Sequence, residues 1–398
     1  MGGAFILLPV WGTAPLVAAK RDVMLIETQA ASTDGGTPRL LAPSESPVSI
    51  PGEYQQTEPP TGDVQATLRR RVLSPQTLVS FGIAVAVLWF VVRRLDVDPG
   101  AIWAQVRQAN LWLLAVAYML WYGAFFVRGW RWGRMLDSAG LNRAHGFSIP
   151  ATFELAEIIV LAYFANSLVP AKLGDAYRSY SLKRESGVPF SAGFGTILAE
   201  RLVDAMMVVI VLAGAVLAVF GTEMPSQARP TLLLGALVVV AGVCGLAVLW
   251  LTRNAVVRFL PERIQDAYAR LYGAIFGALR RPALVFGIGV LLWLNDGMRV
   301  WFVARSLDAD ISPAVAILVA VMGALLTVIP FTPAGLGVVE LGVGSVLVGV
   351  LGVDPVVAGS IMLLDRVVAY WTLLAVGTGL YLRRTRREYR ELASIPPA

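Results

Sequence analysis

The chain has 398 residues, of which 57% are hydrophobic and only 15% charged, and its mean hydropathy is +0.67. Soluble globular proteins carry about 25% charged residues, and the apolar residues here form runs close to the roughly 18 residues that cross a bilayer. The composition therefore excludes a soluble protein and predicts an all-α, polytopic membrane protein. The net charge of +6 is informative through its position along the chain rather than its size.

A single histidine, His145, and a single cysteine, Cys244, restrict the chemistry that is available. One cysteine cannot form a disulfide within the chain, and its apolar surroundings are typical of a packed thiol. One histidine cannot supply a His-rich metal site. We therefore expect no metal, no cofactor, no catalytic residue and no nucleic-acid partner.

The chain divides into an extension (residues 1–68), a transmembrane domain (69–384) and a basic cytoplasmic tail (385–398). The apolar run at residues 4–19 is preceded by no basic residue and interrupted by two prolines, so it predicts neither a signal peptide nor a span. Residues 27–67 are rich in Pro, Ser, Thr, Gly and Gln and have no apolar period, which indicates disorder. A mis-assigned start codon is the alternative explanation for this extension.

The transmembrane domain is predicted to contain six to eight spans together with broken or re-entrant helices. The clearest candidate spans are residues 76–92, 111–127, 193–220, 231–251, 283–303 and 356–382. Residues 148–169 and 312–352 are apolar but interrupted, and they are left as ambiguous. Residues 252–281 are basic at both ends and amphipathic between, a pattern that suits a helix on the cytoplasmic surface.

Basic residues set the orientation and expose a conflict. The run RRTRREYR after the last span predicts a cytoplasmic C-terminus in the cell membrane. Two further basic loops, residues 128–134 and 172–184, are separated by one membrane-length segment. If that segment crossed the membrane, one basic loop would lie outside. We therefore expect residues 148–169 to enter and return as half of a re-entrant hairpin, with their polar side chains facing protein or a cavity. Those side chains are Glu154, Glu157, Asn166 and Ser167.

A short motif occurs twice. Pro170-Ala171-Lys172-Leu173-Gly174 recurs as Pro333-Ala334-Gly335-Leu336-Gly337. Each copy is followed by an acid–arginine pair within a span, Glu200-Arg201 and then Asp365-Arg366, and preceded by an Arg/Trp cluster. Three predicted spans separate the two copies, which places them on opposite membrane faces and predicts an inverted repeat of the kind found in transporters. The alternative is coincidence, because Pro, Ala, Leu and Gly are common in this chain.

The breaks at Pro170, Gly174, Pro333, Gly335 and Gly337 supply the first group of candidate site residues. A half-helix that begins at such a break presents N–H donors to an anion. Lys172, Asp175 and Arg178 border the first break, and the Arg178 guanidinium could bind a phosphate through two hydrogen bonds. An ordinary positive-inside loop is the alternative.

Charged residues within the spans form the second group. Glu200 and Asp204 share one helical face, while Arg201 projects about 100° away. These residues either serve a functional site or form a structural ion pair that locks two helices together. Asp365 and Arg366 lie about a third of the way into the last span, where a charge is more costly. Further candidates are Glu340, which could face the same cavity, and Glu154 and Glu157, which either relay protons or pair with Arg201 or Arg128.

Over about residues 73–382 the chain resembles the transmembrane region of lysylphosphatidylglycerol synthases, a flippase-like membrane family, through three motifs that occur in the same order. They are Pro170, Gly174, Asp175 and Arg178; then Glu200, Arg201 and Asp204; then Thr332 to Gly337 followed by Glu340. Asp175 stands where the family usually has Glu, and Ala334 replaces a Gly. The resemblance implies movement of a modified lipid between leaflets. The soluble aminoacyl-transfer domain is absent before the chain ends at Ala398, so we expect no synthesis of lysyl-lipid.

These observations lead to a lipid-translocase hypothesis with two rivals. In the first, arginines 178, 201 and 366 contact the phosphate of a lipid headgroup, while the nearby carboxylates balance charge or bind a coupling proton. The expected partners are lipids with an anionic or phosphate headgroup and a separately encoded lipid-modifying enzyme. The rivals are a membrane enzyme acting on polyprenyl-linked sugars and a non-transporting scaffold for aminoacyl-lipid or sugar-lipid metabolism.

Overall fold

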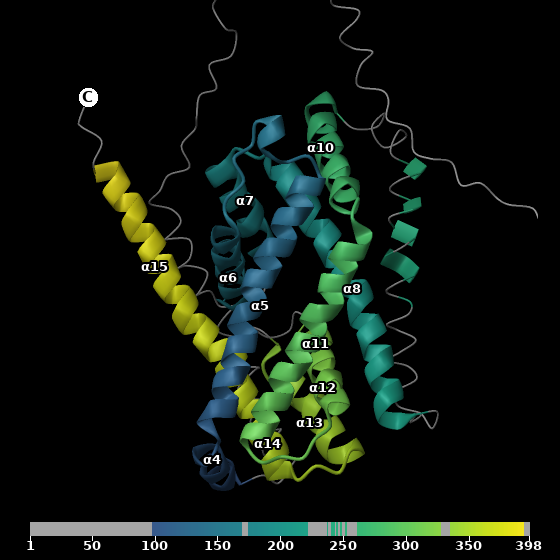
Figure 1. Ribbon diagram of the computed structural model, residues 1–398, viewed down its shortest axis with the longest axis vertical. Helices are drawn as coiled ribbons and strands as arrows, with labels where there is room; N and C mark the ends of the chain where they lie inside the picture. Colours follow the sequence, from purple (N-terminus) through teal and green to yellow (C-terminus); the bar gives the residue numbers. More distant parts are fainter. Residues whose placement is uncertain are drawn as a thin grey trace, which may run out of the picture. The chain divides into compact units, whose positions relative to one another are not determined.

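Figure 1 shows a computed structural model, which describes residues 98–168, 174–221, 261–327 and 335–393 and scattered residues between 237 and 252. All of these belong to the unit Pro60–Ala398. Every regular element within the described ranges is a helix, which confirms the all-α prediction. The predictions for residues 1–68 and for the span at 76–92 lie outside the described residues.

Four helices in the described ranges are long and apolar enough to cross a membrane. They are α5 (Leu111–Ser138), α8 (Phe190–Phe220), α11 (Pro282–Ser306) and the continuous helix formed by α14 (Pro355–Arg366), the π-helical η5 (Val367–Trp371) and α15 (Thr372–Ala393). They confirm the spans predicted at 111–127, 193–220, 283–303 and 356–382. Local sequence fixes where two of them begin, because the side chains of Asn110 and Asp354 accept hydrogen bonds from the first free N–H groups of α5 and α14. The predicted span at 231–251 is only partly described.

Two predicted loops are helical instead. α5 continues beyond residue 127 to Ser138, so the basic run 128–134 forms the last turns of a helix. Residues 174–184 of the second basic stretch likewise lie in α7 (Gly174–Ser186). The charges suggested loops because an unpaired charge is costly in a span. Here Arg128, Arg131 and Arg178 have carboxylate partners on other helices, which offsets that cost.

The helices α5 and α11 run antiparallel along their lengths. At one end, the Asn110 amide donates to the carbonyl oxygen of Ser306 at 2.7 Å, and further along the side-chain amide of Asn295 donates to the carbonyl oxygen of Leu120 at 3.1 Å. We call the two ends of this pair the Leu111 end and the Ser138 end. The directions of the other helices are described relative to these two ends.

The first hairpin enters from the Ser138 end. It consists of α6 (Thr152–Leu168) and α7 (Gly174–Ser186). The start of α6 lies against Gly129 in the second half of α5, and further on Tyr163 meets Phe125 edge to face at 5.2 Å. α7 then returns and meets the start of α8, where the Ser179 hydroxyl donates to the Phe190 carbonyl oxygen. Residues 152–168 thus form one arm of a hairpin, as the prediction for residues 148–169 requires, and the depth of this hairpin in the membrane stays a prediction.

The second hairpin enters from the Leu111 end. It is formed by α12 (Pro313–Leu326), α13 (Val338–Gly344) and the π-helical η4 (Ser345–Val350). α12 begins beside the last turns of α11, where the Trp301 indole donates to the Ile311 carbonyl oxygen at 3.1 Å, and Ile317 contacts Gly297 further along. Figure 1 shows the α6–α7 and α12–α13 hairpins at opposite ends of the long helices. This is the arrangement that the inverted repeat predicts.

Two further α-helices and a short 3-10 helix, η2 (Arg143–His145), lie outside the long helices and the two hairpins. The amphipathic stretch at 252–281 contains α10 (Glu262–Ala278), whose buried face packs against α8 and the end of α5. Its position relative to the membrane surface stays a prediction. A short helix, α4 (Pro99–Arg107), packs against α14 and has no counterpart among the predicted elements.

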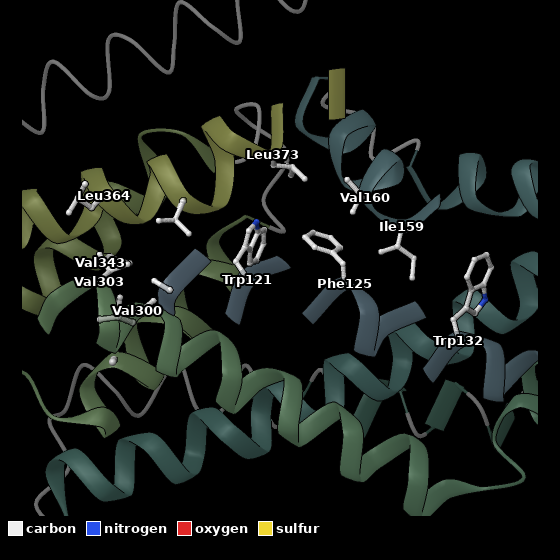
Figure 2. Packing of buried hydrophobic residues seen from close by; sticks show 14 of the residues in the cluster. Trp121, Phe125, Trp132, Ile159, Val160, Val300, Val303, Val343, Leu364 and Leu373 are labelled. Carbon is white, nitrogen blue, oxygen red and sulfur yellow. The ribbon is translucent and has the colours of Figure 1, made fainter. Parts of the chain in front are cut away.

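The main apolar core surrounds α5. Figure 2 shows Trp121 and Phe125 of α5 lying between side chains of α6 and of the α14–α15 helix. Val300 and Val303 of α11 extend the same cluster. Since α5 contacts both the first hairpin and the second half of the chain, it holds the charged side chains of the two repeats within one bundle.

Candidate functional site: two clusters of ion pairs

Arg131 of α5 is the centre of the first cluster. Its guanidinium donates to Glu200 at 2.8 Å and to Asp204 at 2.8 and 3.1 Å. Both acceptors lie on α8, four residues apart, so the prediction that they share a helical face is confirmed. Sequence reasoning placed Arg131 in a basic loop and missed it as a site residue.

Arg178 binds the second oxygen of the same Glu200 carboxylate at 2.7 Å. Its guanidinium also lies over the ring of Trp132, 4.3 Å from the centroid, and the Trp132 indole donates to the Thr196 hydroxyl. Arg178 is 1% exposed. Glu200 therefore joins α5, α7 and α8, and Arg178 is occupied by a carboxylate rather than held open for an anion.

Asp175 and Arg201 form the most accessible pair of this cluster. The Arg201 guanidinium donates two parallel hydrogen bonds to the two Asp175 oxygens, at 2.9 and 2.7 Å. The Arg201 side chain is 41% exposed and that of Asp175 25%. As predicted, Arg201 points away from Glu200 and Asp204.

The second cluster lies on the second hairpin and α14. The Arg366 Nε donates to Glu340 at 2.6 Å, and the other Glu340 oxygen accepts the Gly337 amide at 2.6 Å. Gly337 and Gly335 have φ values of 85° and 68°, a conformation that favours glycine. The neighbouring Asp365 forms an ion pair with Arg299 of α11.

The two clusters repeat one pattern of contacts. In the first copy, Glu200 binds Arg131 of the long helix before the hairpin, and Arg201 binds Asp175 near the start of the second hairpin helix. In the second copy, Asp365 binds Arg299 and Arg366 binds Glu340 in the same way. The latter contact joins residues 26 apart in both copies, Asp175 with Arg201 and Glu340 with Arg366. Coincidence does not explain shared contacts at the same spacing, so the geometry supports the repeat.

A further pair connects the two halves. Arg128 of α5 binds Asp296 of α11 at 3.0 Å, with its guanidinium 5.8 Å from the ring centroids of Phe125 and Tyr163. The suggested pairing of Glu154 and Glu157 with Arg201 or Arg128 is therefore wrong. Glu154 instead accepts the Ala151 amide at the start of α6.

The tip of the first hairpin depends on Gly174. Its amide donates to the Asn166 side chain at 2.7 Å, and a Cβ at this position would lie 2.2 Å from the Ala162 carbonyl oxygen. Gly174 begins α7, and Gly335 and Gly337, both with positive φ, directly precede α13. Pro170, Lys172 and Pro333 lie outside the described residues. In the described part of the chain, His, Cys, Asp and Glu side chains form no group that could hold a metal ion.

Residues 77–377 match the family described as lysylphosphatidylglycerol synthase TM region. The chain belongs to this family. The matched range contains both hairpins and every ion pair described above. A further pair, Arg384 with Glu185, joins α15 to the end of α7, and its Arg384 lies beyond this range.

Relatives of the chain match it at low identity. A UPF0104 membrane protein of Methanocaldococcus jannaschii is 26% identical over 219 residues, which are 55% of this chain and 93% of that protein. A UPF0104 membrane protein of Methanothermobacter thermautotrophicus is 25% identical over 317 residues, 74% of this chain and 90% of that protein. The protein named glycosyltransferase AglD of Haloferax volcanii is 25% identical over 358 residues, which cover 80% of this chain but 56% of that protein.

Proposed function

We propose that this family member is a lipid translocase that moves a lipid with a phosphate-bearing headgroup between the leaflets of the cell membrane. The observation that carries the proposal is a pair of hairpins that enter the bundle from its opposite ends. The first hairpin places Asp175 against Arg201 of α8, and the second places Glu340 against Arg366 of α14. Inverted repeats with discontinuous helices are a recurring design of transporters, with the substrate held between the repeats.

The arginines differ in how exposed their side chains are, and we assign their roles from this difference. Arg201 is the accessible one, and two parallel N–H donors suit a phosphate as well as they suit a carboxylate. We assign it the first contact with the headgroup, and Arg366 the corresponding contact in the second repeat. Arg178 is enclosed by Glu200 and Trp132, so we assign it the positioning of Glu200 rather than a phosphate contact.

The distribution of charge supports a cytoplasmic Ser138 end. Among the described residues, Arg134, Lys183, Arg184, Arg280, Arg281 and the arginines of α15 lie toward that end, whereas Arg107 and Arg305 lie toward the Leu111 end. Because Lys and Arg are enriched on the cytoplasmic side, the C-terminus is proposed to be cytoplasmic.

A reconstitution experiment tests the proposal. The full chain is incorporated into phosphatidylcholine vesicles that contain a trace of fluorescently labelled phosphatidylglycerol, and a reductant that cannot cross the membrane quenches the label in the outer leaflet. We expect loss of protected label with wild-type protein, and at least tenfold slower loss with Arg201→Ala. Arg305→Ala is the matched control, because Arg305 is an exposed arginine paired with Asp310 outside the two clusters. Equal rates for wild-type and protein-free vesicles would overturn the proposal for this lipid class.

A second candidate follows from the likeness to glycosyltransferase AglD. In that case the chain would serve a separately encoded enzyme of sugar-lipid or aminoacyl-lipid metabolism without moving lipid itself, and no enzymatic role of its own is proposed. Co-purification with such an enzyme, together with no lipid movement in the vesicle assay, would favour this candidate.

A further inference from the structure

The ion pairs between helices in the two clusters and their connecting pair are balanced in charge. Among the described residues they comprise six arginines and six carboxylates. The arginines are Arg128, Arg131, Arg178, Arg201, Arg299 and Arg366, and the carboxylates are Asp175, Glu200, Asp204, Asp296, Glu340 and Asp365. Each arginine has at least one carboxylate partner.

This balance has a consequence for binding an anion. A phosphate that takes an arginine from its carboxylate adds one negative charge to a set that was neutral. The displaced carboxylate would then lie unpaired among apolar helices, where a lone charge is disfavoured. A phosphate-bearing headgroup therefore binds far better if the displaced carboxylate takes up a proton at the same time.

Asp175 is the carboxylate that such an exchange would displace. Its pair with Arg201 is the one in which both side chains are at least a quarter exposed, whereas each other pair of the two clusters, and the Arg128–Asp296 pair that connects them, contains a partner that is no more than 13% exposed. Glu200 binds two arginines, and Glu340 also holds the Gly337 amide. Displacing either of these would break more contacts than displacing Asp175.

We propose that the headgroup phosphate displaces Asp175 from Arg201 and that Asp175 takes up one proton from water, so that an anionic lipid moves together with a proton. The two hydrogen bonds from Arg201 pass from the carboxylate to the phosphate oxygens. The proton is released when Asp175 binds Arg201 again on the other side of the transport step. This inference rests on the proposed function and adds the coupling ion and its carrier.

The groups around the exchange do not supply the proton in place of water. Glu200 of α8 and Tyr163 of α6 both interact electrostatically with Arg201. On α7, Arg178 binds Glu200. Glu200 is held by two arginines. Tyr163 packs its ring against Phe125 and Arg128. Asp175 is thus the carboxylate at this position that can exchange its arginine for a proton.

A pH gradient separates this inference from the proposed function. Vesicles of phosphatidylcholine with a trace of labelled phosphatidylglycerol and the full chain are prepared with an interior one pH unit more alkaline than the exterior, and the final distribution of label between leaflets is measured. If each lipid moves with one proton, the inner-to-outer ratio should rise toward about tenfold, since one pH unit is a factor of ten in proton activity. Protein-free vesicles correct for passive movement of the lipid.

Two variants separate coupling from movement. Asp175→Asn, which imitates the protonated form, should still move lipid, but to equal amounts in the two leaflets despite the pH gradient. Asp310→Asn lies outside the clusters and should behave as wild type. Lipid movement by the wild type to an equal ratio under the gradient would overturn this inference and leave the proposed function standing. No movement in the wild type would overturn both. A folded Asp175→Asn protein that still concentrates lipid about tenfold would overturn Asp175 as the proton carrier, and a wild-type ratio of one overturns the coupling whether or not that variant folds.

Discussion

Replacing Glu200 by Gln tests how much the first cluster contributes to stability. The substitution keeps the shape of the side chain and removes its charge. Glu200 is 4% exposed and accepts hydrogen bonds from Arg131 at 2.8 Å and from Arg178 at 2.7 Å. The change therefore removes a shared carboxylate from two buried arginines without leaving a cavity.

The magnitude follows from what each arginine retains. Arg131 keeps its hydrogen bonds to Asp204, whereas Arg178 keeps only the contact with the Trp132 ring among the interactions described above. Removing one partner of a buried ion pair costs about 3–5 kcal/mol. Because one of the two arginines remains paired, we expect a loss of about 3 kcal/mol in the free energy of unfolding.

The assay is unfolding of the purified protein in mixed micelles with increasing denaturing detergent. Asp137→Asn is the matched control, since Asp137 pairs with Arg134 at 4.0 Å and both side chains are well exposed. Such a surface pair contributes about 0–1 kcal/mol. The double variant Glu200→Gln with Arg178→Gln should be less destabilised than the sum of the single variants, because it removes the unpaired charge as well.

A loss for Glu200→Gln within 1 kcal/mol of the loss for Asp137→Asn would refute this reasoning. Full additivity in the double variant would refute the direct coupling between Glu200 and Arg178. Either result would mean that water or lipid headgroups solvate these arginines in the membrane, rather than the carboxylates of α8.

The same unfolding measurement tests three other positions. Glu340→Gln should cost about 3–5 kcal/mol, because Glu340 holds both an arginine and the Gly337 amide; a cost under about 1 kcal/mol would contradict the likeness of the two clusters. Gly174→Ala should cost about 1–3 kcal/mol through overpacking at the hairpin tip, while Gly123→Ala, with nothing within 4 Å of its added Cβ, should not destabilise. Glu185→Gln should cost less than about 1 kcal/mol, and high salt should reduce the difference further, because its pair with Arg384 is partly exposed.

The fold could be predicted where the sequence carried a local signal. Apolar length located the long helices, and the surplus of basic loops required residues 148–169 to return to the side from which they entered. The acid–arginine pairs also stood out, because a charge within an apolar run is rare. These signals are short in range and need no knowledge of how the helices pack.

The partners of the charges could not be predicted in the same way. Arg131 and Arg299 complete the two clusters, and Asp296 binds Arg128, yet their partners lie 66 to 168 residues away along the chain. Helical periodicity indicates which residues share a face but not which other helix that face meets. The one available signal was that Arg128 and Arg131 are three residues apart, on one face of a helix that could continue past residue 127.

The number of paired charges argues for exchange rather than for rigidity. Buried ion pairs are weak contributors to stability, and replacing them by apolar residues of similar volume is often neutral or stabilising. A bundle that needed only to stay folded would gain little from six arginines and six carboxylates between its helices. Pairs such as Asp175–Arg201 are instead suited to a protein that breaks and remakes them, because a ligand with a phosphate can replace the carboxylate with little change in the contacts of the arginine. On this reasoning the accessible pair matters most for the proposed transport, and the enclosed Arg131–Glu200–Arg178 group holds it in place.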